Sequence, residues 1–521
     1  MALDLLVPIA MRRLLLLSLI GCHIGSSGPL EVTSIEPMEG SVAGGTRVTI
    51  HGGGFDGAHV TIGGVPCGSV SVDDDHLSCT TGDRELQEGA ADVVVTTDAG
   101  TATLPAAYRY ACTWTTSTGR KSCGAAPPGK PPEQQVASWI TQMDPGSGFV
   151  ANPGITNLDD TLDFTLGTQS ALVETAGTGA PRTLAKTGMT PIDFTGKVAR
   201  VWVKLEGVDH LGDLEIQLGS GNLSNAFEFS LRTGQSRQWF TDGDWISVAV
   251  PWTPTKVAGT PDRSRITDVM VRVSDDASGN HVRLHLNGIA LVAEAPAFPG
   301  GVVSFTFDDN FATMVDPAAA ILTAHGLPAT AYVITDEVDK PGRAKLTDLK
   351  SLAMLGWDIS VHAYTEVDHA LHYTNLSPAE VEDDMVNARA WLIANGFAGY
   401  DHCAYPSGEF SPDVLALAGQ YFTSCRTIYS SQQELFPPSD SRRLRVGYVT
   451  EGVTLAQAEQ WVDEALANHD WLVLVLHRIV DAPTLNTEWR TSDFQTLADY
   501  VAASGLPVKT VSEVYATGGG P

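Results

Sequence analysis

After Gly301 the sequence alternates between short apolar segments and longer amphipathic segments, and this alternation limits the possible folds more than any other feature. The strand-like segments are VVSFTF, ATAYVI, WDISV, HCAY, TSCRTI and WLVLVLH. Helix-like segments separate them, including MVDPAAAILTAHG, one with Ser377 as its predicted N-cap and one with Thr454 as its predicted N-cap. Such alternation predicts a parallel sheet, and six or more repeats in about 220 residues indicate a (β/α) barrel.

Polar residues follow the predicted strands of this region. Asp308 and Asp309 end the segment VVSFTFDDN, and His477 ends WLVLVLH. His362 follows a third strand, with His369 seven positions further on, and a Pro-Ser-Gly turn follows a fourth. Catalytic residues of such barrels lie at the C-terminal ends of the strands, and two carboxylates with several histidines there favour metal-assisted hydrolysis. A glycosidase, which needs a carboxylate pair around the scissile bond, fits this histidine-rich set poorly.

Length and charge limit the possible functions further. A chain of 521 residues predicts about three domains. The net charge of −29 argues against a nucleic-acid partner and against electrostatic binding to anionic lipid, because both require a basic surface. We therefore expect an acidic, exported protein that is a monomer.

The N-terminus has the features of an export signal. Two arginines precede the seven-residue apolar segment Leu14–Ile20, which is too short to span a bilayer, and Met11 is the predicted start. Residues 1–22 are predicted to be a signal peptide whose sequence LIGC resembles a bacterial lipobox ending at Cys22. The protein is then a cell-envelope lipoprotein; the alternative is a plain secretory signal and a secreted protein.

The six remaining cysteines form pairs that are close in the sequence. An exported protein oxidises its cysteines, so disulfides are predicted rather than a zinc site. Six cysteines allow fifteen connectivities, and nearest-neighbour pairing is the working hypothesis. The pairs are Cys67/Cys79, Cys112/Cys123 and Cys403/Cys425.

Residues 31–110 contain short alternating strands separated by Gly and Asp turns, which predicts a β-sandwich. The segments IEPMEGSVAGGTRVTIHGGGF, VTIGGVPCGSV and GTATLPAAYRY resemble the IPT/TIG family of immunoglobulin-like domains. The resemblance implies a spacer or adhesion module without chemistry of its own. A linker rich in Pro, Gly, Ser and Thr follows at 111–132.

Residues 133–297 alternate with period two, as in VARVWVKLEGV and HVRLHLNGIALVAE, and contain no long helical pattern. We predict a jelly-roll β-sandwich, which resembles the modules that accompany carbohydrate-active enzymes. Its tryptophans either stack on sugar rings or fill the core; the four in question are Trp202, Trp239, Trp245 and Trp252.

The domain predicted at 298–517 resembles the polysaccharide deacetylases of the NodB-homology type (carbohydrate esterase family four) over 301–512. The family folds as a distorted (β/α) barrel and removes N- or O-acetyl groups from sugars with one divalent metal. Its TFDDG motif matches up to Asp309, with Asn310 in place of glycine. The resemblance implies that Asp308 is the general base and Asp309 a metal ligand.

The family's second motif, H-x₃-H, supplies two histidine ligands. His362 matches the first, but the fourth residue after it is Glu366. We favour His369 as the second ligand, with Glu366 and His372 as alternatives. Zinc is the expected ion for a set of one aspartate and two histidines.

The third motif, R-x-P-Y-G, appears here as AYPSG, so its arginine and its tyrosine are replaced. Tyr405, Pro406 and Ser407 are predicted to bind substrate, and the backbone N–H of Ser407 to stabilise the oxyanion. The missing arginine normally orients the general base. Arg445 and Arg478 are the candidates to replace it.

The last motif matches Leu476 and His477. The resemblance implies that His477 is the general acid, and Leu476 is predicted to contact substrate. The aspartate that usually accompanies this histidine has no clear match; Asp401 and Asp481 are candidates.

These features together predict a metal-dependent carbohydrate deacetylase that carries two β-sandwich modules. The changes in the second and third motifs leave one alternative, a surface protein that binds glycan with a degenerate, non-catalytic barrel. Poly-N-acetylglucosamine, chitin oligomers, peptidoglycan and acetylated xylan all remain possible substrates.

Overall fold

A computed structural model describes residues 29–518, apart from 43, 74–75, 83, 85–87, 112–113, 116–120, 123–130, 153–154, 232–238, 295–296 and 430–432. The chain separates into two compact units, one ending at Ala111 and one beginning at Cys112. The predicted signal peptide, the lipobox and the Cys112/Cys123 pair lie outside the described residues. Across the described part of the chain, the helices are too short or too polar to cross a membrane.

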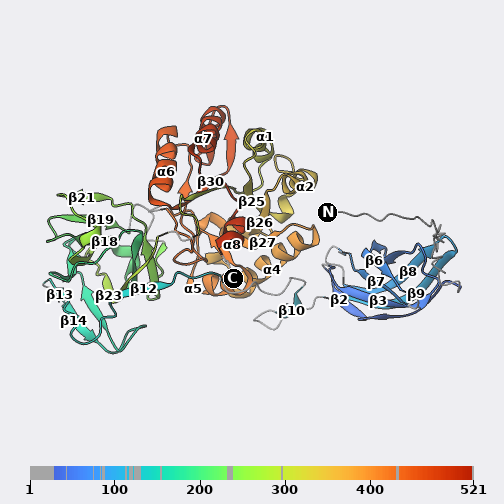
Figure 1. Cartoon of the computed structure of the whole chain (residues 1–521), viewed down its shortest axis with the longest axis horizontal. Helices are drawn as coiled ribbons and strands as arrows, with labels where there is room; N and C mark the ends of the chain where they lie inside the picture. Colours follow the sequence, from blue (N-terminus) through green and yellow to red (C-terminus); the bar gives the residue numbers. More distant parts are fainter. Residues whose placement is uncertain are drawn as a thin grey trace, which may run out of the picture. The chain divides into compact units, whose positions relative to one another are not determined.

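The N-terminal unit is built from two β-sheets (Figure 1). Alternate residues such as Val48 and Ile50 are buried between them, as the period-two pattern predicts. The predicted Cys67–Cys79 disulfide is present. One sheet has the order β1 (Glu31–Glu36), β3 (Arg47–Gly53), β7 (His76–Thr80), β6 (Gly68–Val72), and the other β2 (Glu39–Ser41), β9 (Gly100–Ala111), β8 (Gly89–Thr97), β4 (His59–Ile62), β5 (Val65–Pro66). Two short strands of the predicted linker, β10 (Trp114–Thr115) and β11 (Lys121–Ser122), pair with each other.

The second unit begins with two six-stranded antiparallel sheets that share one apolar core. The β-sandwich prediction is confirmed at this level. One sheet consists of β14 (Ile155–Asp160), β15 (Ser170–Glu174), β23 (Arg283–Ala293), β17 (Lys197–Glu206) and β20 (Trp245–Val250), with β12 (Val136–Thr141) also on β23. The other consists of β13 (Val150–Ala151), β16 (Arg182–Lys186), β22 (Asp268–Asp275), β18 (Leu211–Gly219), β19 (Ala226–Ser230) and β21 (Lys256–Ala258).

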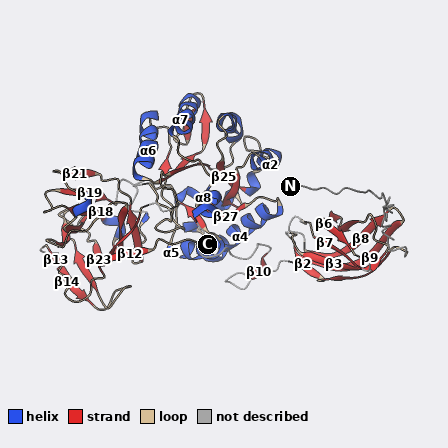
Figure 2. Ribbon diagram, viewed as in Figure 1, coloured by secondary structure: helices blue, strands red, loops and turns tan. Residues whose placement is uncertain are grey.

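The C-terminal region contains a seven-stranded parallel sheet, and every α-helix of the described residues lies in this region (Figure 2). The short helical segments of the middle sandwich are 3-10 turns. Most of its strands are buried along their whole length, as expected when helices cover the sheet. β28 and β29 are the two edges of this order, so among the described residues no ladder between them closes a complete barrel. The order is β28 (Ser424–Arg426), β27 (Gly399–Ala404), β26 (Asp358–Ala363), β25 (Ala329–Ile334), β24 (Val302–Phe307), β30 (Trp471–Leu476), β29 (Gly447–Tyr448); a small outer pair is β31 (Arg478–Val480) and β32 (Glu488–Arg490).

The helices begin largely where the sequence predicts. Ser377 forms a capping box with Glu380, and Thr454 accepts a hydrogen bond from the Gln457 amide. The first predicted helix is interrupted: Asp316 is non-helical because Pro317 follows it, and the segment splits into η4 (Met314–Ala319) and α1. The helices are α1 (Ala320–Ala324), α2 (Leu346–Met354), α3 (Glu366–Leu371), α4 (Pro378–Ala394), α5 (Pro412–Tyr421), α6 (Leu455–Asn468), α7 (Thr491–Ser504) and α8 (Val511–Gly518).

The middle sandwich and the C-terminal sheet are joined by a buried polar seam. The Trp239 indole N–H donates to the Arg443 carbonyl at 2.8 Å, and the Ala249 amide donates to Ser439 at 2.8 Å. Leu435, from the C-terminal region, lies within the core of the sandwich. Trp239 and Trp252 are therefore buried packing residues, whereas Trp202 and Trp245 are half-buried.

Candidate metal centre and active site

The site begins at the C-terminal end of β24, where the backbone turns sharply. Asp308 is 2% exposed, and its amide donates to the Leu476 carbonyl at 3.0 Å. Asp309 and Asn310 both have positive φ, 63° and 39°. Asparagine tolerates this left-handed region better than most residues, which explains how Asn310 replaces the glycine of the family motif. Its side-chain oxygen also accepts the Ile334 amide at 3.0 Å and fixes the turn to the next strand.

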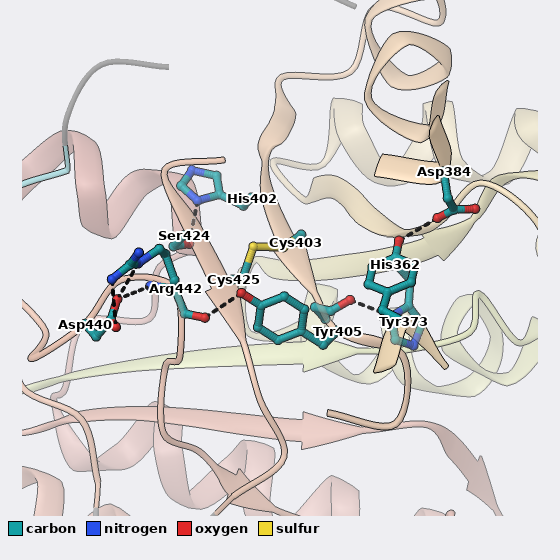
Figure 3. The surroundings of a disulfide bond; sticks show 11 residues. His362, Tyr373, Asp384, His402, Cys403, Tyr405, Ser424, Cys425, Asp440 and Arg442 are labelled. Atoms are coloured by element: carbon teal, nitrogen blue, oxygen red, sulfur yellow. Dashed lines mark hydrogen bonds and ion pairs between the residues drawn. A yellow bond between two sulfur atoms is a disulfide. The ribbon is translucent and has the colours of Figure 1, made fainter. Parts of the chain in front are cut away.

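Three of the predicted residues place their ligand atoms together. Asp309 Oδ1 lies 3.4 Å from His362 Nε2 and 3.3 Å from His369 Nε2, and the two Nε2 atoms are 3.2 Å apart. His362 Nδ1–H donates to the Ala404 carbonyl at 2.9 Å (Figure 3), so the Nε2 lone pair of the neutral ring faces the other two atoms. The sequence predicted this set, and the structure brings it together.

The spacing of these atoms suits a small divalent cation. Asp309 Oδ1 is buried, and each of the two Nε2 atoms that face it can offer a lone pair when its ring is neutral with the proton on Nδ1. Four ligands arranged tetrahedrally at about 2.0–2.1 Å from an ion lie about 3.3–3.4 Å from each other, close to the separations found here. The donor set therefore fits a metal ion of this kind.

The pKa shifts within the cluster reflect burial and the charges of the neighbouring groups. Burial and the neighbouring His362 lower the pKa of His369 to about 4, so this ring is neutral at physiological pH. Burial opposes ionisation of Asp309, but the nearby histidines outweigh it and hold the pKa of this carboxyl below its usual value. Burial lowers the pKa of His362, and the carboxylates of Asp308 and Asp309 outweigh it and raise that pKa.

His369 reaches the cluster because a short helix, α3, follows β26. Thr365 caps this helix by accepting the Asp368 amide at 3.1 Å. Asp384, on α4, accepts the amides of Tyr364 and Thr365 at 2.9 and 3.1 Å and the Tyr373 hydroxyl at 2.5 Å (Figure 3). Burial raises the pKa of Asp384 to about 7. This buried acid was not predicted from sequence, and it fixes the backbone between His362 and His369.

The two alternative ligands occupy different positions. Both ring nitrogens of His372 are already used, by Ser407 Oγ at 2.8 Å and by Glu409 at 3.2 Å. Glu366 Oε2 lies 3.6 Å from His369 Nδ1, the ring nitrogen directed away from Asp309, and 3.6 Å from Arg343. The geometry therefore favours His369 over both alternatives.

We expect H369A to lower the affinity for zinc by more than about 100-fold, because removing a ligand should cost more than the 10–100-fold loss typical of outer-shell changes. E366Q should lower that affinity by less than about tenfold. Competition titration with a chromophoric chelator measures both values. A larger loss in E366Q than in H369A would show that Glu366 is the ligand.

Asp308 pairs with an arginine that the sequence interpretation missed. The Arg426 guanidinium, fully buried at the end of β28, donates to Asp308 Oδ1. Burial opposes ionisation of Asp308, but Arg426 and the histidines outweigh it and hold the pKa of this carboxyl below its usual value. Arg426 also lies over the Tyr332 ring, 4.8 Å from its centroid.

The two predicted partners of the base are wrong. Arg445 pairs with Glu434 at 2.6 Å and donates to the Ala249 carbonyl at 3.2 Å, within the seam to the middle sandwich. Arg478 stacks on the Phe311 ring, 3.9 Å from its centroid. The lost arginine of the third motif is thus replaced from the adjacent strand.

His477 lies next to Asp308, the predicted base. Its Nε2 is 3.6 Å from Asp308 Oδ2, and its Nδ1 is buried without a hydrogen bond among the described residues. Burial outweighs the nearby carboxylates and lowers the pKa of His477. Neither predicted partner contacts His477: Asp401 pairs with Arg389, and Asp481 is exposed whereas His477 Nδ1 is buried without a partner among the described residues.

The residues predicted to bind substrate differ in exposure. Tyr405 is buried, and its hydroxyl donates to the Arg442 carbonyl at 2.7 Å (Figure 3). Pro406 and Leu476 are also buried, whereas Ser407 is exposed at the tip of the turn. Ser407 is therefore the residue of this turn that substrate could contact directly. Substrate binding by Ser407 stays a prediction.

A disulfide joins the strands on which this arrangement depends. Cys403 and Cys425 connect β27 to β28 (Figure 3) and confirm the predicted pair. Each cysteine directly precedes a residue of the site: Ala404 accepts from His362, and Arg426 pairs with Asp308. The bridge therefore fixes the relative position of these two contacts.

Comparison with known families gives two matches. Residues 295–422 match the family model described as polysaccharide deacetylase, and residues 30–110 match that of the IPT/TIG domain. Each match covers less than half of the chain. The deacetylase match covers the aspartate pair and both histidines of the cluster, and it ends before Arg426 and His477.

Relatives cover parts of the chain. Human fibrocystin-L is 35% identical over 83 residues, which are 16% of this chain and 2% of that protein. Three solved structures each match 42% of this chain. They are the Xyl-CE4 domain of a multidomain xylanase from the hindgut metagenome of Trinervitermes trinervoides (17% identity, 92% of that chain, TM-score 0.30), a family 4 carbohydrate esterase from Streptomyces lividans in complex with acetate (19%, 95%, 0.29), and a CE4 family pseudoenzyme from Bacillus anthracis (18%, 66%, 0.29).

Proposed function

We propose that the C-terminal domain is a metal-dependent hydrolase that removes acetyl groups from a polysaccharide. The observation that carries this proposal is the cluster of Asp309, His362 and His369, next to a buried carboxylate and a third histidine. Zinc is the proposed ion, because imidazole and carboxylate ligands at these separations suit its tetrahedral preference.

The groups around this cluster divide the proton transfers. A bound divalent ion would supply Lewis acidity, polarising the acetyl carbonyl and acidifying water. Asp308 accepts the proton of the attacking water at Oδ2, since Arg426 occupies Oδ1. His477 donates a proton to the leaving amine or alcohol, and its Nε2 is 3.6 Å from the atom that receives the first proton. The Ser407 backbone N–H stabilises the oxyanion.

The test is release of acetate by the full chain from N-acetylated chito-oligomers and from acetylated xylan. We expect release to stop after treatment with dipicolinate, which removes the ion, and to return on addition of zinc. Metal content is measured in the same samples. A protein that contains metal and releases no acetate from either substrate would contradict the hydrolase proposal.

A second candidate function is a non-catalytic glycan-binding surface protein. The replacements at Asn310 and Ser407 and the missing motif arginine favour it. Such a protein would retain acetylated glycan in pull-down or calorimetric assays without hydrolysing it. Arg426 argues against degeneration, since a decayed site has no need for a buried partner of the base.

The wider organisation is part of the same proposal. We assign the IPT/TIG domain to 31–110, a linker to 111–132, a jelly-roll sandwich to 133–297 and a distorted deacetylase barrel to 298–517. The chain is exported as a monomeric cell-envelope lipoprotein, or otherwise secreted, which agrees with the disulfides present.

A further inference from the structure

A chain of hydrogen bonds next to the metal cluster connects a serine, a histidine and a glutamate. Ser407 Oγ lies 2.8 Å from His372 Nε2, and His372 Nδ1 lies 3.2 Å from Glu409 Oε2. An ionised carboxylate can only accept, so Nδ1 of the neutral ring carries the proton and Nε2 is the acceptor. The Ser407 hydroxyl therefore donates to His372, as a nucleophile does to its general base.

The backbone is strained at two of these residues. Ser407 has φ 53°, and His372 has φ 62° with ψ 140°. Residues other than glycine adopt such backbone conformations at a cost of about 1–3 kcal/mol each, and strain of this kind clusters at functional sites. A serine on a strained turn, with its hydroxyl exposed, is also how α/β-hydrolases present their nucleophile.

The surroundings keep the three groups aligned and accessible. Ser407 is exposed, and the side chains of His372 and Glu409 are 33% and 38% exposed. Thr374 donates to Glu409 Oε2 at 3.0 Å and holds that carboxylate toward His372. Thr374 and Glu409 also line a cavity of about 430 Å³, together with Phe410, Tyr429 and residues of the middle sandwich. Ser407 does not line this cavity, but its own exposure leaves the hydroxyl open to an ester from solvent.

We propose that Ser407 is an activated nucleophile for acyl esters, with His372 as its base and Glu409 orienting the base. Ser407 Oγ attacks the ester carbonyl while its proton passes to His372 Nε2. The carbon–oxygen bond of the ester breaks, and the alcohol leaves with that proton. Water then attacks the acyl-serine with His372 again as base, which releases the carboxylic acid and restores the hydroxyl. This reaction uses none of the three cluster ligands and goes beyond the proposed deacetylation.

One contact limits the rate of this reaction. The Gly408 amide, which follows the nucleophile, already donates to the Tyr405 carbonyl at 2.8 Å. It is not available as the oxyanion donor that the equivalent amide provides in α/β-hydrolases. We therefore expect reaction with activated esters and phosphonates at a slow rate.

The test is covalent labelling of the full-length, metal-loaded protein with a fluorophosphonate, located by peptide mass spectrometry. We expect the adduct at Ser407, because its oxygen bonds to phosphorus as fluoride leaves. H372A should slow labelling by about 100-fold or more, the range of general base catalysis, and E409Q by about tenfold.

Ser278 provides a matched control. It is exposed and lies 3.3 Å from His210, but Ser278 and Asp276 both contact Nδ1 of that ring, so no proton relay connects them. We expect no adduct there, and S278A should leave labelling at Ser407 unchanged. Absence of an adduct at Ser407, or equal labelling rates in H372A and the parent protein, would overturn the proposal. Neither result depends on acetate release.

Discussion

Replacing Arg426 with methionine is expected to lower the free energy of unfolding by about 3–5 kcal/mol at neutral pH, because it leaves the Asp308 carboxylate buried without its partner. In the parent protein the pKa of Asp308 is lowered, so the stability that it contributes is present above the unfolded pKa of about 3.9 and is lost as the pH falls through the folded value. In R426M the pKa of Asp308 rises. The difference in the free energy of unfolding between the variant and the parent protein should therefore shrink in acid.

Urea denaturation of both proteins across pH 4 to pH 8 measures this difference. R478M is the matched control, since Arg478 stacks on Phe311 and is only partly buried. We expect it to cost less than about 1 kcal/mol, as for exposed charge contacts. An R426M deficit that does not change with pH would contradict the assignment of Arg426 as the partner of the base.

Replacing Asp308 with asparagine is expected to lower the rate of acetate release by about 10²–10⁴-fold, the usual contribution of a general base. Asparagine has nearly the same shape and still accepts from Arg426, so the fold should persist. Zinc content should stay unchanged, because the three proposed ligands are other residues. H477A should produce a loss of the same order with its zinc retained.

Single-turnover rates and metal content of D308N measure this prediction. D309N is the control, and it should lose zinc together with activity. The opposite pattern, in which D308N loses zinc and D309N retains it, would reverse the roles assigned to the two neighbouring aspartates. Full activity in D308N would remove Asp308 from the mechanism.

Local sequence was sufficient to predict those residues of the site that lie at the end of a strand. Asp309 follows β24 and His362 lies near the end of β26, two parallel strands separated by β25, and such strand ends meet at one edge of a sheet. His369 lies beyond the motif spacing, but a short capped helix carries it back. Among the described residues, these side chains lie where the pattern predicts.

The partners of these residues could not be predicted in the same way. Arg426 is 118 positions from Asp308, and the parallel sheet order decides which strand end carries it. Judged by charge alone, Arg445 and Arg478 were equally good candidates for the partner of Asp308. Asp384 resembles an ordinary exposed acid of a helix, and only packing shows that it is buried against a loop. Short helices such as α3 also escape sequence periodicity, since six residues are less than two turns.

The seam between the middle sandwich and the C-terminal sheet bears on how such proteins can be divided or recombined. Leu435 fills the sandwich core from the C-terminal side, and Arg443 donates to the Trp239 carbonyl at 3.0 Å across the boundary. A cut near 297 would expose apolar surface and leave buried donors without acceptors on both halves. Expression of the C-terminal domain by itself should therefore yield aggregated protein, and exchange of the sandwich between homologues should succeed only when the seam residues are exchanged with it.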